Sequence, residues 1–376
     1  MDPINMCDLK GQYLRIKGEI DAAISEVIES AAFVKGPPVK KFADNLATYL
    51  NVNHVIPCAN GTDALQIALM ALELKPGDEV ITADFTFIAT VEVISLLGLT
   101  PVLVDVDPLT YNINPELIEK SITSKTKAII PVHLFGHAAE MEKIMEIANK
   151  HQLYVIEDNA QALGTEYYFR DGTIKKTGTI GHIGCTSFFP TKNLGCFGDG
   201  GAICTNDHKL AKKMESIANH GMEQRYYHHR IGVNSRLDSI QAAILNVKIK
   251  YLDEYIRSRQ AAAEYYSTYL ARHGCFQVPA IMRYSTHIFH QYTLLLQEIN
   301  RTEFQEYLHS KGIPTMIYYP VPLHRQQAFT WGNYKDEDFP VTENLCKNVI
   351  SLPMHTELNI TQLKYMIGTI EAFINQ

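Results

Sequence analysis

The 376-residue sequence lacks the features that mark several large classes of protein. Its seven cysteines are scattered, odd in number and form no Cys-x-x-Cys pair, which indicates reduced thiols rather than a disulfide framework. No apolar run reaches the ~18 residues that a membrane-spanning helix needs. The polar residues 1–5 do not resemble a signal peptide. We therefore expect a cytoplasmic protein without a membrane span.

Positively charged residues are fewer than negatively charged ones, so the net charge is −7 and the sequence pI is about 6.1. No basic stretch outweighs this balance, which argues against a nucleic-acid-binding protein. The fifteen histidines form no His-Glu-x-x-His motif, and the adjacent His228 and His229 are not at a ligand spacing. We expect neither a metal site nor a nucleic-acid partner.

The order of helical and strand-like segments predicts an α/β fold. Residues 36–245 alternate helices with short apolar strands, which is typical of a mostly parallel sheet covered by helices. We expect an N-terminal arm and helix in residues 1–35, and a bridging helix with a smaller α+β C-terminal domain in residues 246–376. The strand candidates are residues 54–57, 79–82, 102–106, 128–132, 154–157, 186–189, 202–205, 292–296 and 315–318.

Lys192 is the most informative single residue. It stands between an aromatic, strand-like segment at 186–189 and a glycine-rich stretch at 195–201. A lysine in a confined site can be deprotonated near neutral pH and can form a Schiff base with an aldehyde. An exposed loop lysine is the alternative, and Lys192 alone does not exclude it.

Gly61, Thr62 and Asp63 stand at the start of an amphipathic helix. The free N–H groups and the positive end of the helix dipole at such a position suit a phosphate group. Gly61 allows a close approach, and the hydroxyl of Thr62 adds a donor. An ordinary helix cap is the alternative for these residues.

Asp158 and Phe87 follow apolar strands, where open α/β sheets bind their ligands. A carboxylate at the end of a strand can keep the nitrogen of a pyridine ring protonated. The neighbouring Glu157 should point to the opposite face of the same strand. Phe85 and Phe87 share a face if their segment is extended, so that one of them could stack on a flat ring, although paired phenylalanines are usually core residues.

Six motifs occur in order over nearly the whole chain. Together they resemble the DegT/DnrJ/EryC1/StrS family of sugar aminotransferases. The resemblance implies the aspartate-aminotransferase fold, also called fold type I. It also implies pyridoxal 5′-phosphate as cofactor, with the pyridoxamine 5′-phosphate form in the reaction. The motifs are residues 60–65, 86–90, 157–162, 187–192, 232–238 and 318–324.

The resemblance implies roles for single residues. Lys192 is similar to the lysine that binds the cofactor covalently, and Asp158 to the carboxylate that partners the pyridine nitrogen. Phe87 is similar to the aromatic that stacks on the ring, and Gln161 to the group near its phenolic oxygen. The other cofactor-binding assignments are Gly61, Thr62, Asp63 and Ser187, with Asn234 supplied by the second subunit of a homodimer that shares its active sites.

The substrate side of the site departs from the family at one position. Arg236, Tyr318 and Tyr319 resemble residues near the sugar, but family members often have histidine where this chain has Tyr318. They also often have proline or another residue in place of Asp84. Arg236 could pair with a sugar carboxylate or a diphosphate, or it could be a structural arginine.

The Lys192 motif and its glycine-rich extension are most similar to enzymes that aminate the 3-keto position of UDP-2-acetamido-2-deoxy-glucuronic acid for bacterial surface polysaccharides. The resemblance implies L-glutamate as the amino donor. The alternatives are an aminotransferase for a dTDP-keto-6-deoxyhexose, a sugar dehydratase with the same cofactor, and a regulatory or scaffolding protein without turnover. Lysine rather than histidine at position 192 favours transamination.

Overall fold

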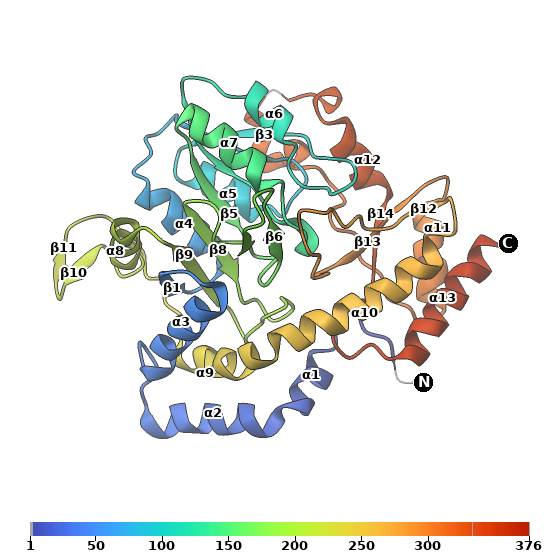
Figure 1. Cartoon of the computed structure of the whole chain (residues 1–376), viewed down its shortest axis with the longest axis horizontal. Coiled ribbons are helices and arrows are strands. Elements are labelled where there is room, and N and C mark those ends of the chain that lie inside the picture. Colours follow the sequence, from blue (N-terminus) through green and yellow to red (C-terminus); the bar gives the residue numbers. More distant parts are fainter. Residues whose placement is uncertain (1–2, 333, 376) are drawn as a thin grey trace.

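The computed structural model describes residues 3–332 and 334–375. Its centre is a seven-stranded sheet with helices packed around it (Figure 1). β5 pairs in parallel with β4 and β8, and β2 with β3 and β4, whereas β9 runs antiparallel to β8 and β1. In sheet order the strands are β1 (His54–Cys58), β9 (Gly201–Thr205), β8 (Ile183–Ser187), β5 (Tyr154–Asp158), β4 (Thr126–Ile130), β2 (Glu79–Ala83) and β3 (Thr100–Val104).

The two faces of this sheet are buried in separate hydrophobic clusters. Alternate side chains of a strand point to opposite faces, so Ile81 and Val155 belong to one cluster while Val80 and Ile156 belong to the other. Burial of both faces explains why the strands are almost continuously apolar in sequence. The covering helices are α3 (Pro37–Leu50), α4 (Gly61–Ala71), α5 (Ala89–Leu96), α6 (Pro115–Lys120), α7 (Met141–His151) and α8 (His208–Ile217).

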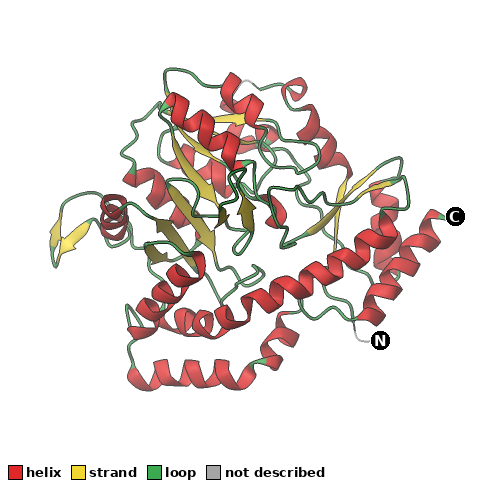
Figure 2. Cartoon of the chain, viewed as in Figure 1, coloured by secondary structure: helices red, strands yellow, loops and turns green. Residues whose placement is uncertain are grey.

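A long helix, α10 (Leu252–Leu270), runs from the large sheet to a second, three-stranded antiparallel sheet (Figures 1 and 2). α2 packs on α9 through Ile20, Ile244 and Val247. Two short hairpins, β6–β7 (Glu166–Tyr168, Ile174–Lys176) and β10–β11 (Met222–Gln224, Tyr227–His228), complete the strands. The remaining elements are α1 (Leu9–Arg15), α2 (Lys17–Ser30), α9 (Ser239–Lys248), α10 (Leu252–Leu270), β12 (Phe276–Gln277), β13 (Tyr292–Leu296), α11 (Arg301–Ser310), α12 (Pro340–Asn348), β14 (Val349–Leu352) and α13 (Ile360–Ile374).

The mostly parallel sheet covered by helices confirms the predicted fold class. The strand expected at residues 315–318 is wrong, because Met316 makes only an isolated bridge to Ser351 beside the small sheet. The division into residues 1–35, 36–245 and 246–376 stays a prediction. Within the described residues, no helix is long and apolar enough to cross a membrane.

Candidate active site

Lys192 lies in the loop that leaves the carboxyl end of β8. Its backbone N–H donates to the carbonyl oxygen of Phe189 at 2.8 Å, which closes a turn. Burial lowers the pKa of its amine to about 8, and the negative charge of Asp158 opposes that shift only in part. An amine with this pKa is present in both protonation states near neutral pH, so it can accept and return a proton.

Asp158 is the last residue of β5, the parallel neighbour of β8. Thr90 donates its hydroxyl to Oδ2 at 2.8 Å, and the Ala160 N–H donates to Oδ1 at 3.2 Å. These bonds fix the orientation of a carboxylate whose charge acts on Lys192. The structure therefore brings the two residues predicted to be catalytic into one site, where their individual roles stay predictions.

Glu157 points to the other face of β5 and serves a different purpose. Its fully buried carboxylate accepts a hydrogen bond from His133 Nε2 at 2.8 Å. It also accepts the backbone N–H groups of Gly178 at 2.8 Å, and of Ile180 and Gly181 at 2.6 Å. Glu157 thus holds the chain that leads into β8, and with it the strand that precedes Lys192.

We expect Glu157→Gln to lower the free energy of unfolding by about 3 kcal/mol, because hydrogen bonds to a charged group are strong and an amide presents one acceptor in place of two. Urea denaturation followed by circular dichroism measures the change. The folded fraction of the variant should keep kcat within a few-fold of wild type. An unchanged unfolding midpoint would show that this buried carboxylate is dispensable.

The start of α4 packs directly against the end of β8. A Cβ atom added to Gly61 would lie 2.7 Å from Ser187 Cβ, so only glycine fits there. Asn60 caps the helix by accepting the N–H of Asp63 at 2.7 Å. Within residues 3–332 and 334–375, no acceptor is recorded for the N–H groups of Gly61 and Thr62. Free N–H groups at a helix start suit a phosphate, so the assigned residues fit one.

The two phenylalanines after β2 have different environments. Phe85 is only 1% exposed and belongs to the hydrophobic core, where its ring contacts Tyr319 edge-on at 5.9 Å. Phe87 is 54% exposed, and its ring centroid lies 6.3 Å from that of Tyr319. The exposed ring of Phe87 has room to stack on a ligand and the buried ring of Phe85 has not, and the role expected for Phe87 stays a prediction.

Gln161 links the large sheet to the C-terminal part of the chain. Its Oε1 accepts the Phe135 N–H at 2.8 Å, which leaves Nε2 to donate to the hydroxyl of Tyr319 at 3.1 Å. Burial raises the pKa of Tyr319, so the hydroxyl stays protonated. Tyr318 lies beside Tyr319, with their ring centroids 6.0 Å apart.

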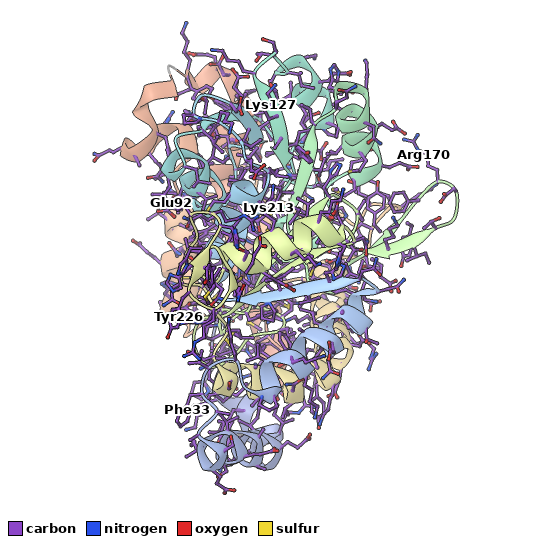
Figure 3. All side chains as sticks on the ribbon, turned by 90° about the vertical axis from the view of Figure 1, so that its left-hand side faces the viewer. Phe33, Glu92, Lys127, Arg170, Lys213 and Tyr226 are labelled. Carbon is purple, nitrogen blue, oxygen red and sulfur yellow. The ribbon has the colours of Figure 1, made fainter. Side chains whose placement is uncertain are left out.

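Asn234 and Arg236 follow the β10–β11 hairpin, which projects from the body of the molecule (Figure 1). Asn234 forms an isolated bridge to Asn219, and among the described residues no hydrogen bond or ion pair joins Asn234 or Arg236 to Lys192 or Asp158. Apolar side chains are exposed on and just after the hairpin, with Tyr226 77% and Ile231 86% exposed. Tyr226 lies on the face turned to the viewer in Figure 3. The contribution expected from Asn234 and Arg236 to the site stays a prediction.

Two site residues escaped the sequence reasoning. Thr90 lies inside the motif at residues 86–90, so the sequence indicated that this segment belongs to the site. The sequence did not indicate the hydrogen bond from Thr90 to Asp158. His290 is buried near Lys192, and its Nδ1 atom has no hydrogen-bond partner within the part of the chain that the structure describes. Burial and the charge of Lys192 lower its pKa, so the ring is neutral. No local pattern around residue 290 points to this position.

A lysine of lowered pKa, a carboxylate at a strand end, a helix start with free N–H groups and an exposed aromatic ring fit pyridoxal phosphate. The DegT/DnrJ/EryC1/StrS aminotransferase family matches residues 14–371. The chain belongs to this family. It is accordingly a pyridoxal-phosphate-dependent aminotransferase.

Curated relatives cover the chain almost completely. The "pleiotropic regulatory protein" of Geobacillus stearothermophilus is 46% identical over 98% of both chains. The UDP-2-acetamido-2-deoxy-3-oxo-D-glucuronate aminotransferase of Pseudomonas aeruginosa is 45% identical over 98% of this chain and 99% of its own. The UDP-N-acetyl-3-dehydro-alpha-D-glucosamine 3-aminotransferase of Acidithiobacillus ferrooxidans is 43% identical over 99% of this chain and 98% of its own.

Solved structures agree with the fold. A family aminotransferase from Brucella abortus is 41% identical, with a TM-score of 0.94 over 99% of this chain and all of its own. DesV of S. venezuelae is 36% identical, with a TM-score of 0.95 over the full length of both chains. Ntda of Bacillus subtilis, solved with its cofactor pmp, is 32% identical with a TM-score of 0.88 over 96% of this chain and 82% of its own. The predicted fold type I and the predicted cofactor are thereby confirmed.

Proposed function

We propose that this aminotransferase moves the amino group of L-glutamate to the 3-keto position of UDP-2-acetamido-2-deoxy-glucuronic acid, in the synthesis of a bacterial surface polysaccharide. The support for the sugar is that relatives at 45% and 43% identity are named for 3-oxo and 3-dehydro UDP sugars. The dTDP-sugar transaminases among the relatives are 39% identical or less. A cytoplasmic location stays a prediction.

The observation that carries the proposed chemistry is the pairing of Lys192 with Asp158. Bound pyridoxal phosphate supplies an electron-withdrawing ring that stabilises negative charge beside the transferred nitrogen. Lys192 Nζ, with a pKa of about 8, moves a proton to and from the substrate carbon that gains or loses the amine. Asp158, held in place by Thr90, would keep the proton on the ring nitrogen. Gln161 and Tyr319, which are hydrogen-bonded to each other, would help to hold the ring.

Product analysis by mass spectrometry tests this function. The purified protein is incubated with L-glutamate and a panel of UDP- and dTDP-linked keto-sugars. We expect the amino sugar to form fastest from the UDP-linked 3-keto glucuronic acid derivative. Faster amination of a dTDP-keto-6-deoxyhexose would favour the alternative substrate, and loss of the keto-sugar without gain of nitrogen would indicate a dehydratase.

The regulatory name of the Geobacillus relative belongs to that protein. In this chain the lysine with a pKa of about 8 and the oriented carboxylate favour turnover over a purely regulatory role. Bleaching of the visible absorbance of the holoenzyme by L-glutamate distinguishes the two, because a protein without turnover would keep its spectrum.

We further propose that a homodimer shares its active sites, with Asn234 and Arg236 of one subunit completing the site of the other. The exposed apolar side chains on and just after the β10–β11 hairpin, Tyr226 and Ile231, support this arrangement. A two-fold interface repeats each such contact twice.

Mixing inactive Lys192→Ala protein with inactive Arg236→Ala protein should therefore restore activity. In a mixed dimer one site carries both lesions and the other carries neither, so we expect at most about half of the wild-type activity per mixed dimer. Native mass spectrometry confirms that subunits have exchanged. If the exchanged mixture stays inactive, each site is built within one chain.

A further inference from the structure

Two loops that line the active site are joined by a buried pair of charged side chains, Asp84 and His324. Asp84 follows β2 and precedes Phe85 and Phe87 in the chain. His324 belongs to the segment that begins with Tyr318 and Tyr319. Both side chains are almost completely buried, although 240 residues separate them in sequence.

Three hydrogen bonds tie His324 and its neighbour to Asp84. The His324 N–H donates to Asp84 Oδ1 at 2.8 Å, and its Nδ1 donates to Oδ2 at 2.7 Å. The Leu323 N–H donates to the backbone oxygen of Asp84 at 3.3 Å. This bidentate contact fixes both the backbone and the ring of His324, so the two loops cannot shift independently.

The second ring nitrogen of His324 also faces carboxylates. Nε2 lies 3.3 Å from Asp336 Oδ1 and 3.4 Å from Glu343 Oε1. An ionised carboxylate accepts hydrogen bonds and cannot donate them. His324 can therefore donate from both ring nitrogens to carboxylates only as the imidazolium ion, which carries a proton on each nitrogen. The Phe339 ring covers one face of the imidazole, with the ring centroids 4.6 Å apart.

The charges around the pair favour a cationic His324. Burial opposes the charge, but the hydrogen bond and charge of Asp84 and the charge of Glu343 outweigh it, so the pKa of His324 is raised from 6.5. Burial raises the pKa of Asp84 from 3.8, and His324 counters that shift. Arg325 also pairs with Asp336 and Glu343, and Lys347 pairs with Glu343 at 4.0 Å. The titratable groups that face the pair are Asp105, Tyr334, Asp336, Glu343, Cys346 and Arg325.

We propose that Asp84 and cationic His324 are positioning residues that hold Phe87 and Tyr319 in place for the cofactor, so that pyridoxal phosphate binds more weakly once His324 loses its proton. Phe87 is three residues from Asp84, and its ring contacts Tyr319. Tyr319 also receives the hydrogen bond from Gln161. The inference rests on the proposed placement of Phe87 and Tyr319 beside the cofactor.

The sign of the pH dependence follows from the raised pKa of His324. The contribution of the charged pair is fully present below pH 6.5 and is lost as the pH rises through the higher pKa in the folded protein. Lys192 also titrates in this range, with a pKa of about 8. A ratio of variant to wild type at each pH removes the contribution of Lys192, because both proteins carry that lysine.

The test is the dissociation constant of pyridoxal phosphate for wild type and His324→Gln, measured by absorbance titration of the full chain from pH 6 to pH 9. We expect the variant to bind about tenfold more weakly or worse at pH 6, where a charge-assisted bond is lost. The ratio should fall towards about threefold as the pH rises through the raised pKa of His324 and the wild-type ring loses its charge. Asp84→Asn should show the same loss, and His273→Gln, which changes a histidine paired with Glu371 on the C-terminal helix, should match wild type at every pH.

A ratio that stays constant from pH 6 to pH 9 would overturn the proposal, because a purely structural histidine would weaken binding equally at every pH. Wild-type affinity in both His324→Gln and Asp84→Asn would overturn it as well. The titration uses the cofactor alone and no sugar, so its outcome is independent of the substrate. A failure of the sugar assay would therefore leave this test intact.

Discussion

Lys192→Ala should bind pyridoxal phosphate but should lose turnover, with kcat lower by about 10⁴-fold or more, since it removes the group that moves the proton. A second lysine, Lys248, provides a comparison within the same protein. Burial lowers the pKa of both Lys192 and Lys248 to about 8. The amine of Lys248 already donates to the Gly195 carbonyl oxygen at 2.6 Å, whereas among the described residues Lys192 has no hydrogen bond from its amine.

Borohydride reduction of the wild-type holoenzyme, followed by peptide mass spectrometry, identifies the lysine that carries the cofactor. We expect the added mass on the peptide that contains Lys192 and none on the peptide that contains Lys248. The Lys192→Ala protein should retain no cofactor after reduction and denaturation. Label on Lys248, or turnover by the alanine variant, would refute the assignment.

Asp158→Asn should lower kcat by about 10²-fold or more, which corresponds to ~3 kcal/mol of activation free energy. Thr90 and Ala160 bind different oxygens of Asp158, so the single oxygen of asparagine can keep only one of these hydrogen bonds, and the neutral amide cannot hold the ring nitrogen protonated by charge. Steady-state kinetics with L-glutamate and the keto-sugar measure the loss.

Glu157→Gln is the matched control for Asp158→Asn, because it removes the neighbouring carboxylate on the opposite face of β5. We expect the control to lose stability but to keep kcat within a few-fold of wild type. Near wild-type kcat in Asp158→Asn would show that another acid partners the ring nitrogen. An equal loss of kcat in both variants would point to a general effect on β5.

Many residues of the candidate site could be predicted from local sequence patterns. Lys192, Asp158 and Gly61 each stand at the end of a strand or the start of a helix, where a short stretch of sequence already shows the turn and the exposed polar group. The structure places them at the same edge of the sheet. Phe85 and Phe87 were equivalent in sequence, and only the exposed fraction of each side chain separates core from site.

Contacts between distant segments could not be predicted from the chain alone. Gln161 and Tyr319 are 158 residues apart, and Asp84 and His324 are 240 apart, so no spacing rule links them. The failed strand at residues 315–318 has a similar cause. The local apolar pattern is typical of a strand, but the segment pairs with the small sheet only through the isolated bridge between Met316 and Ser351.

The central claim, that the protein transfers nitrogen to a nucleotide-linked keto-sugar, is tested most directly by tracing that nitrogen. The holoenzyme is incubated with ¹⁵N-labelled L-glutamate and UDP-2-acetamido-2-deoxy-3-oxo-glucuronate, and the sugar nucleotide is recovered for mass spectrometry. We expect a product that carries ¹⁵N at carbon 3 in place of the keto oxygen, with stoichiometric 2-oxoglutarate. Consumption of the keto-sugar with no ¹⁵N in the product, under conditions where glutamate bleaches the cofactor spectrum, would contradict it.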